Sequence, residues 1–126
     1  MKLSEGREQR FVAFREWLNH NTELSERPIG DAVSRVKRVE RGLPEMLGGV
    51  DLDAEYARDQ LDSVIRALEY TLEDVHNHRE PPDGIVFKFG HDDARFYEKI
   101  REGLSSLHYA VQLYRNFCDA ENQRLG

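Results

Sequence analysis

The residues of this sequence that could perform acid–base or metal chemistry are its five histidines and the carboxylates beside them. His76 and His78 are separated by one residue, so on a helix their side chains would point about 200° apart and could not bind one metal ion. A shared two-histidine site requires the helix to fray there. His91 precedes Asp92 and Asp93, and we expect one of these carboxylates to cap the start of the last helix. The sequence therefore predicts no metal site and no cofactor.

Nucleophilic and phosphate-binding chemistry lacks the residues that it needs. The single cysteine, Cys118, falls on the apolar side of the last predicted helix, where a buried thiol is inert, and no base can be named beside it. Gly48 and Gly49 have neither the preceding strand nor the following Lys-Ser/Thr of a phosphate-binding loop. We therefore predict that the chain is not an enzyme.

Charge is distributed unevenly along the chain. The net charge is -6. Residues 43–94 carry 4 basic and 13 acidic residues, whereas residues 1–42 carry 9 basic and 7 acidic ones. An acidic middle disfavours a protein that coats nucleic acid, but it permits one basic face directed at DNA.

A basic face is predicted on the second helix, which should begin at Ser25 and Pro28 and end at Gly42 and Pro44. Its aliphatic residues fall on one side and its basic residues on the other, where they could contact a phosphate backbone. The alternative is a solvated surface, and Glu40 reduces its positive charge. The candidate DNA-binding residues are Arg35, Lys37, Arg38 and Arg41, together with Lys99 and Arg101 of the last helix.

An acidic face is predicted on the third helix. Its apolar spacing indicates one helix from Asp53 to His78, roughly 39 Å long at 1.5 Å per residue. The carboxylates on its outer side could bind a basic partner protein. The candidate protein-interaction residues are Glu55, Asp59, Asp62, Glu69 and Glu73, with Phe87 and Phe89 of the following segment.

The segment from Ile85 to Phe89 has the only strand-like alternation in the sequence. A lone strand leaves its backbone groups unpaired, so this pattern favours a homodimer in which the segment pairs with a second copy. The competing interpretation is that Phe87 and Phe89 fold back as a lid over the chain's own core.

The remaining helices should run from about Glu5 to Asn19 and from about Asp93 to Gln123, with Gly103 marking a kink, a break into two helices or a close helix crossing. These elements predict an all-α fold: one compact bundle of four to five helices, forming a single domain over residues 1–126. The expected core consists of Phe14, Leu18, Val33, Val36, Leu61, Ile65, Leu68, Leu72, Leu104, Leu107, Val111 and Tyr114.

Composition and sequence ends bear on the compartment. No apolar run approaches the ~20 residues that cross a bilayer, so no membrane contact is expected. The segment from Met1 to Arg10 lacks the apolar stretch of a signal peptide, and one cysteine allows no internal disulfide. We therefore expect a cytoplasmic protein.

Three helices resemble parts of a known domain. Phe11–Leu18 (F-V-A-F-R-E-W-L) resembles the x-x-F-x-x-W-L opening of the core-binding domain of tyrosine recombinases, the phage integrases. Ser25 and residues 29–38 are similar to its polar link and next helix, although Val33 replaces an aromatic residue. Leu104–Phe117 is similar to its closing helix, L-S-A-L-R-x-Y-x-x-F. The resemblance covers about half of the chain and implies a SAM-like helical domain whose partner is DNA or a protein.

This resemblance implies no recombinase activity, because the arginine–histidine–arginine–tyrosine set of the catalytic domain has no place in the sequence. Together with the basic second helix, it favours a non-enzymatic binding module that contacts duplex DNA or assists a DNA-processing system. The alternative is a small acidic interaction module, or inhibitor, that presents its third helix to a basic partner protein.

Overall fold

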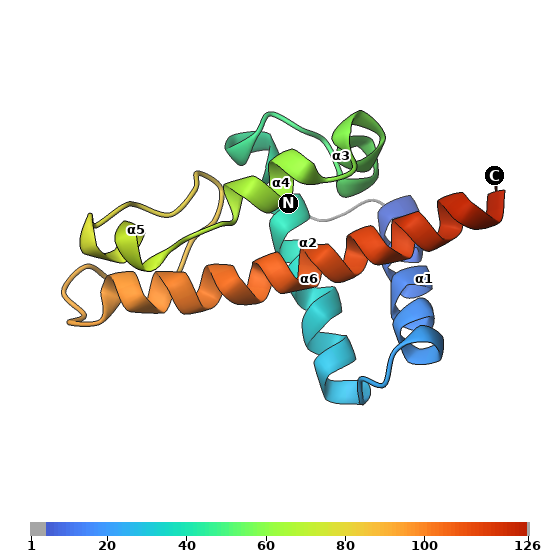
Figure 1. Ribbon diagram of the computed structural model, residues 1–126, viewed down its shortest axis with the longest axis horizontal. Coiled ribbons are helices and arrows are strands. Elements are labelled where there is room, and N and C mark those ends of the chain that lie inside the picture. Colours follow the sequence, from blue (N-terminus) through green and yellow to red (C-terminus); the bar gives the residue numbers. More distant parts are fainter. Residues whose placement is uncertain (1–4, 126) are drawn as a thin grey trace.

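Six helices make up residues 5–125, the part of the chain that the computed structural model describes, and these residues contain no strand (Figure 1). The predicted all-α fold is confirmed. The helices are α1 (Glu5–Asn21), α2 (Glu26–Met46), α3 (Leu52–Asp59), α4 (Asp62–Ala67), α5 (Leu72–His76) and α6 (Phe96–Leu125).

The long helix α6 is the axis on which the others pack. Helices α1 and α2 cross it on one side, while α3, α4 and α5 follow one another along its edge (Figure 1). Phe11, Phe14 and Tyr114 are fully buried where α1 meets α6, with the rings of Phe14 and Tyr114 5.0 Å apart. All of the predicted core residues are buried except Leu72, which is 57% exposed. Leu72 begins α5 after the chain has left α4, so it no longer shares a helical face with Leu68.

The prediction of one long third helix is wrong. The chain turns sharply at Gln60 and Leu61, whose φ angles of 59° and 69° are left-handed, and this turn places the side chain of Leu61 in the core. A second break follows Leu68, and Thr71 then caps α5 through a reciprocal pair of bonds with Asp74. Three short helices therefore curve around α6 in place of one straight helix.

The predicted end of α2 at Gly42 and Pro44 is also wrong, because the helix continues to Met46. Gly42 is buried and lies against the backbone of Gly84, where an added Cβ would stand 2.6 Å from the Gly84 carbonyl oxygen. The glycine therefore permits a close approach of two chain segments and does not terminate the helix.

The predicted strand is absent, and residues 84–90, which we name the strap, lie instead along α2 and α6. Ile85 is 3% exposed, and Phe87 and Phe89 pack against the same core. The alternative interpretation, a lid over the chain's own core, is confirmed. Because these side chains already face inward, the strap does not support the predicted homodimer.

Helix α6 contains Gly103 without a break. An added Cβ there would overlap the ring of Phe87, which belongs to a non-helical segment, so Gly103 marks neither a break nor a helix crossing but a close contact with that segment. Asp93 accepts a bond from the amide of Arg95 over 2.8 Å, but Arg95 precedes Phe96, the first residue of α6, so this bond closes a turn ahead of the helix and is not the expected cap of its first amides. Within residues 5–125, no helix is both long and apolar enough to cross a bilayer.

Candidate functional site

The predicted basic face is largely neutralised by contacts within the chain. Lys37 Nζ lies 2.9 Å from a carboxylate oxygen of Glu8, and Lys99 Nζ lies 2.6 Å from Asp93. Arg38 donates to the carbonyl oxygen of Val86, and its guanidinium stands 4.9 Å from the centre of the Phe87 ring. Burial lowers the pKa of Arg38. These three cations are therefore already engaged within the chain.

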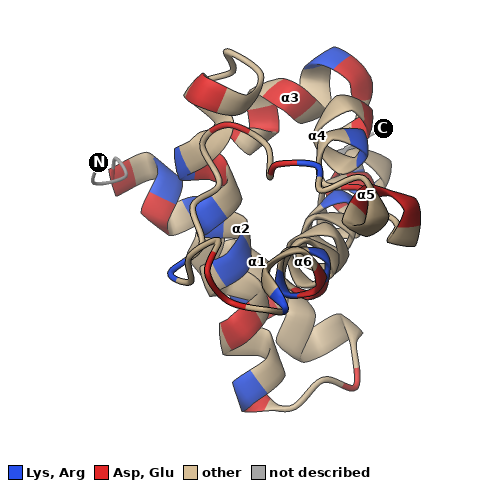
Figure 2. Cartoon of the chain, turned by 90° about the vertical axis from the view of Figure 1, so that its left-hand side faces the viewer, with Lys and Arg blue, Asp and Glu red and all other residues tan. Residues whose placement is uncertain are grey.

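Arg35, Arg41 and Arg101 have no ion pair among the described residues. Arg41 and Arg101 are exposed, and Arg35 is half-buried. Basic and acidic positions both occur along the ribbons in Figure 2. The six candidate DNA-binding residues therefore do not form one free basic surface.

Four helices meet at a cluster of polar side chains, which we name the polar junction: Arg7, Arg10, Glu40, Asp53 and Tyr114. Arg7 Nε lies 3.0 Å from Glu40 Oε2, and its Nη1 lies 2.7 Å from Asp53 Oδ2. Arg10 Nε and the Tyr114 hydroxyl donate to the two oxygens of Asp53, each over 2.8 Å. The junction thus joins α1 to α2, α3 and α6.

Mutual stabilisation shifts the pKa values at the junction. Burial opposes ionisation of Asp53, but hydrogen bonds from Arg7 and Tyr114 and the charges of Arg10 and Arg7 hold its pKa below the usual value. Burial and the Asp53 carboxylate raise the pKa of Tyr114. The same two causes raise the pKa of Cys118 to about 12. None of these shifts moves a pKa toward neutral pH, so the junction is better suited to holding α1 in place than to transferring protons.

The sequence did not predict that Glu40 points inward. Glu40 was expected on the basic surface, but it is 2% exposed and also accepts the amide of Leu52 over 2.8 Å. One signal was available. Arg7 and Arg10 share a side of α1 with Phe14, and a charge on an apolar face requires a buried partner.

The five predicted acidic residues have different roles. Glu55 is buried and pairs with Arg58 over 2.8 Å, which corrects the prediction that it faces a partner. Asp59 accepts the amide of Ser63 over 3.1 Å, within the first turn of α4. Asp62 forms an exposed pair with Arg66, 2.9 Å long.

Glu69 and Glu73 are different, because their carboxylates are exposed and form no ion pair or hydrogen bond in the part of the chain that the structure describes. Glu69 follows α4 and Glu73 lies in α5. These two carboxylates are what remains of the predicted acidic face.

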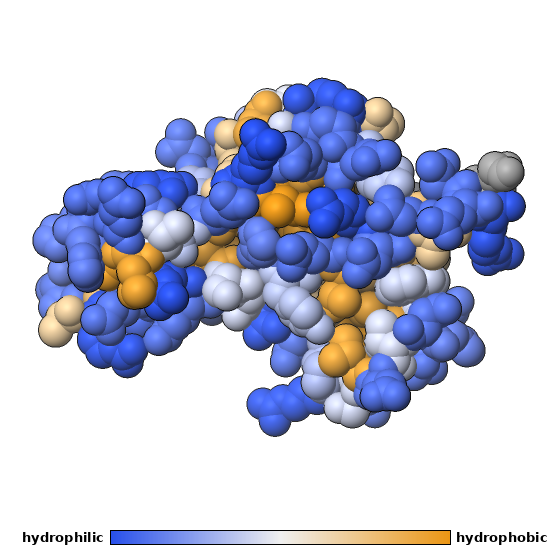
Figure 3. All heavy atoms as spheres, in the orientation of Figure 1, coloured by the Kyte–Doolittle hydropathy of each residue, from blue (hydrophilic) through white to orange (hydrophobic). Residues whose placement is uncertain are grey.

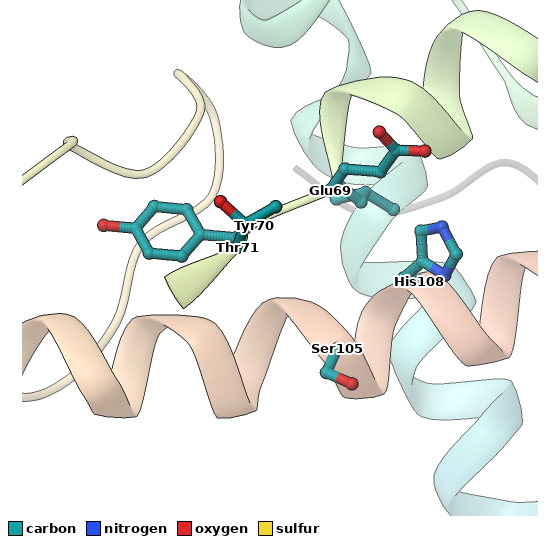
Figure 4. A pocket seen from close by; sticks show the side chains of 6 residues that line it. Glu69, Tyr70, Thr71, Ser105 and His108 are labelled. Atoms are coloured by element: carbon teal, nitrogen blue, oxygen red, sulfur yellow. The ribbon is translucent and has the colours of Figure 1, made fainter. Parts of the chain in front are cut away.

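An open groove of about 240 Å³ lies beside Glu69, and we name it the α4–α6 groove. Figure 4 shows His108 rising from α6 toward Glu69, whereas the Ser105 hydroxyl points away from the imidazole, so these residues form no serine–histidine relay. Figure 3 shows apolar surface between α4 and α6 and over α5. Near the groove in the sequence, Leu72 and Tyr109 are 57% and 50% exposed. The groove is lined by Leu68, Glu69, Tyr70, Thr71, Ser105 and His108.

A second hollow contains the two histidines that were expected to diverge on one helix. Helix α5 ends at His76, and His78 has a φ of 53°, so both side chains line a hollow beside Tyr97 and Glu98. The ring of His78 stacks on Tyr97 with centroids 4.5 Å apart. Within residues 5–125, no three His, Cys, Asp or Glu side chains are placed to hold a metal ion.

Compared with known proteins, the chain matches no family model, no curated protein and no solved structure. The resemblance to the integrase core-binding domain therefore stays a prediction from the sequence. The structure gives several of its residues a packing role, since Phe14, Leu18, Leu104 and Leu107 are all buried.

Proposed function

We propose that the protein is a non-enzymatic helical binding module that takes a basic segment of a partner protein along the α4–α6 groove. The observation that carries this proposal is a pair of exposed carboxylates without an ion pair among the described residues: Glu69, which lines the open groove, and Glu73, which lies four residues further along the chain in α5. The other predicted acidic residues are already bonded within the chain. A lysine or arginine of the partner would pair with Glu69 and Glu73.

Apolar contacts would supply most of the affinity. An exposed ion pair contributes less than about 1 kcal/mol, so two such pairs hold a partner only weakly. Leu68 and Tyr70 line the groove. Leu72 and Tyr109, each next in sequence to a lining residue, are exposed, and a partner that reaches them would bury further apolar surface. A partner segment with one large apolar residue flanked by cations fits these features.

Duplex DNA, bound by a SAM-like core-binding module, is the competing function. Arg35, Arg41 and Arg101 are the cations that would contact phosphates, since Lys37, Arg38 and Lys99 are engaged within the chain. Phosphate contacts make log affinity fall linearly with log salt concentration, with a slope set by their number. Three free cations predict a shallow slope and weak binding.

The test selects a phage-displayed library of random 12-residue peptides on the wild-type protein and on two charge-reversal variants. We expect wild type to enrich peptides with lysine or arginine beside an apolar residue, and Glu69→Lys/Glu73→Lys to lose them. The matched control, Glu23→Lys/Glu45→Lys, reverses two exposed carboxylates elsewhere and should keep the enrichment.

Two outcomes would overturn the proposal. One is equal enrichment on all three proteins, or none on wild type. The other is salt-dependent binding of a 20-base-pair duplex that Glu69→Lys/Glu73→Lys leaves unchanged and Arg41→Glu removes, which would establish the DNA function.

A further inference from the structure

The strap is held against the protein by alternate side chains, as a bound peptide would be. Ile85, Phe87 and Phe89 pack against the core, whereas Val86 and Lys88 between them are exposed. Figure 2 shows the chain passing across α2 before it enters α6. Side chains with a period of two therefore occupy one side of an extended segment.

The surface beneath the strap is shaped for large side chains. On α6, the absence of a side chain at Gly103 leaves the space that the Phe87 ring fills. On α2, Gly42 allows the backbone of Gly84 to approach and contacts Ile85. Helices α2 and α6 thus contribute one notch each, at Gly42 and at Gly103.

Two cations hold the strap from its flanks. Arg38 of α2 donates to the Val86 carbonyl oxygen and stacks over the Phe87 ring at 4.9 Å. Lys99 of α6 stands 5.8 Å from the centre of the Phe89 ring. Cation–π contacts of this kind recognise aromatic side chains of any chain that presents them at this spacing.

The strap makes few backbone bonds of its own. Among the hydrogen bonds of the described residues, no amide of residues 86–89 acts as a donor. Its attachment therefore depends on side chains in pockets and on one carbonyl group, and an external segment with the same side chains could replace every one of these contacts.

We infer that the α2–α6 surface beneath the strap is a second binding groove. Its ligand is an extended segment of a partner protein that carries large apolar residues at alternate positions, as in Ile85-Val86-Phe87-Lys88-Phe89, and the strap is its internal competitor. A tethered competitor is present at an effective concentration on the order of millimolar, so the groove accepts a partner only when the strap is displaced. This inference is independent of the α4–α6 groove.

The test measures binding of a labelled synthetic peptide that corresponds to residues 83–91 with Lys88→Gln, by fluorescence anisotropy on the full-length protein. Phe87→Ser frees the strap but leaves the notch at Gly103 empty, so it should bind the peptide at least tenfold more tightly than wild type. Gly103→Ala also dislodges Phe87 but fills the notch, so it should not bind. A peptide in which Phe87 is replaced by serine is the matched ligand control and should not bind Phe87→Ser.

Failure of Phe87→Ser to bind, or equal binding of the two peptides, would overturn the inference. If Phe87→Ser lacks a cooperative unfolding transition, and so is not folded, a second experiment uses the wild-type protein. Excess peptide should then speed tryptic cleavage after Lys88, since displacement exposes the strap, and the peptide itself contains no trypsin site. Unchanged cleavage would overturn the inference equally.

Discussion

Asp53 accepts bonds from Arg7, Arg10 and Tyr114, so removing its charge would deprive two half-buried guanidinium groups of one of their carboxylate partners. Asp53→Asn keeps the shape of the side chain and removes its charge. We expect it to lower the free energy of unfolding in urea by about 2 kcal/mol. The exposed control Glu23→Gln should stay within about 0.5 kcal/mol of wild type. A similarly small change for Asp53→Asn would show that the junction does not hold α1.

Individual residues were predictable where one helical face decides their position. Phe14, Leu68 and Tyr114 were expected in the core and are buried there. Glu40 and Arg7 were not expected to pair, because 33 residues separate them and their meeting depends on how α1 crosses α2. A side chain's partner in another helix is set by packing geometry, and a single sequence carries no direct signal for it.

At the scale of elements, the left-handed turn at Gln60 predicts whether a glycine substitution there stabilises or destabilises the fold. Gln60 has left-handed φ and ψ angles of 59° and 35°, which glycine adopts without steric cost. Gln60→Gly should therefore raise the free energy of unfolding by about 0.5 kcal/mol. In the continuous helix expected from the sequence, the same change would lower it by about 1 kcal/mol. Gln9→Gly in α1 is the helical control and should show that loss.

The turn escaped prediction because apolar spacing continues across it. Leu61, Val64, Ile65 and Leu68 follow the helical pattern on one side of the turn, and Ala57, which is exposed in α3, extends it on the other. No glycine or proline marks the position, so periodicity alone merges two helices into one. The predicted end of α2 was wrong for the opposite reason. Gly42 resembles a residue that ends a helix, but here it allows close packing against Gly84.

Gly42 and Gly30 provide a matched pair within α2. Gly42→Ala would drive a Cβ against the backbone of Gly84, which cannot move like a flexible side chain, so we expect a loss of about 2 kcal/mol in unfolding free energy. Gly30→Ala meets no atom within 4 Å and should gain up to about 1 kcal/mol from helix propensity. Thermal unfolding of both variants measures the difference. A gain for both would mean that the strap is not packed on α2.

At the scale of the whole molecule, opposite pKa shifts limit stability on both sides of neutral pH. An unfolded aspartate titrates near about pH 4. Because Asp53 has a lowered pKa in the fold, its contribution is present above that pH and is lost as the pH falls through the folded pKa. Tyr114 acts in the opposite sense, because its raised pKa stabilises the fold below about pH 10 and this contribution is lost above it.

Cys118 should set the start of the alkaline decline. An unfolded cysteine loses its proton near about pH 8.5, whereas burial and Asp53 raise the pKa of Cys118 to about 12 in the fold. Between these values the unfolded chain releases a proton that the folded protein retains, so stability falls by up to about 1.4 kcal/mol per pH unit. Cys118→Ala removes this contribution and leaves Tyr114 in place.

We expect urea unfolding, with reductant present, to show wild type losing about 1 kcal/mol more than Cys118→Ala between about pH 8.5 and pH 9.5. The variant should be less stable at neutral pH, because it leaves a small cavity, and should approach wild type as the pH rises. Parallel pH profiles would contradict the prediction. They would mean that the thiol ionises as readily in the folded protein as in the unfolded chain, and hence that solvent reaches the place where α1 joins α6.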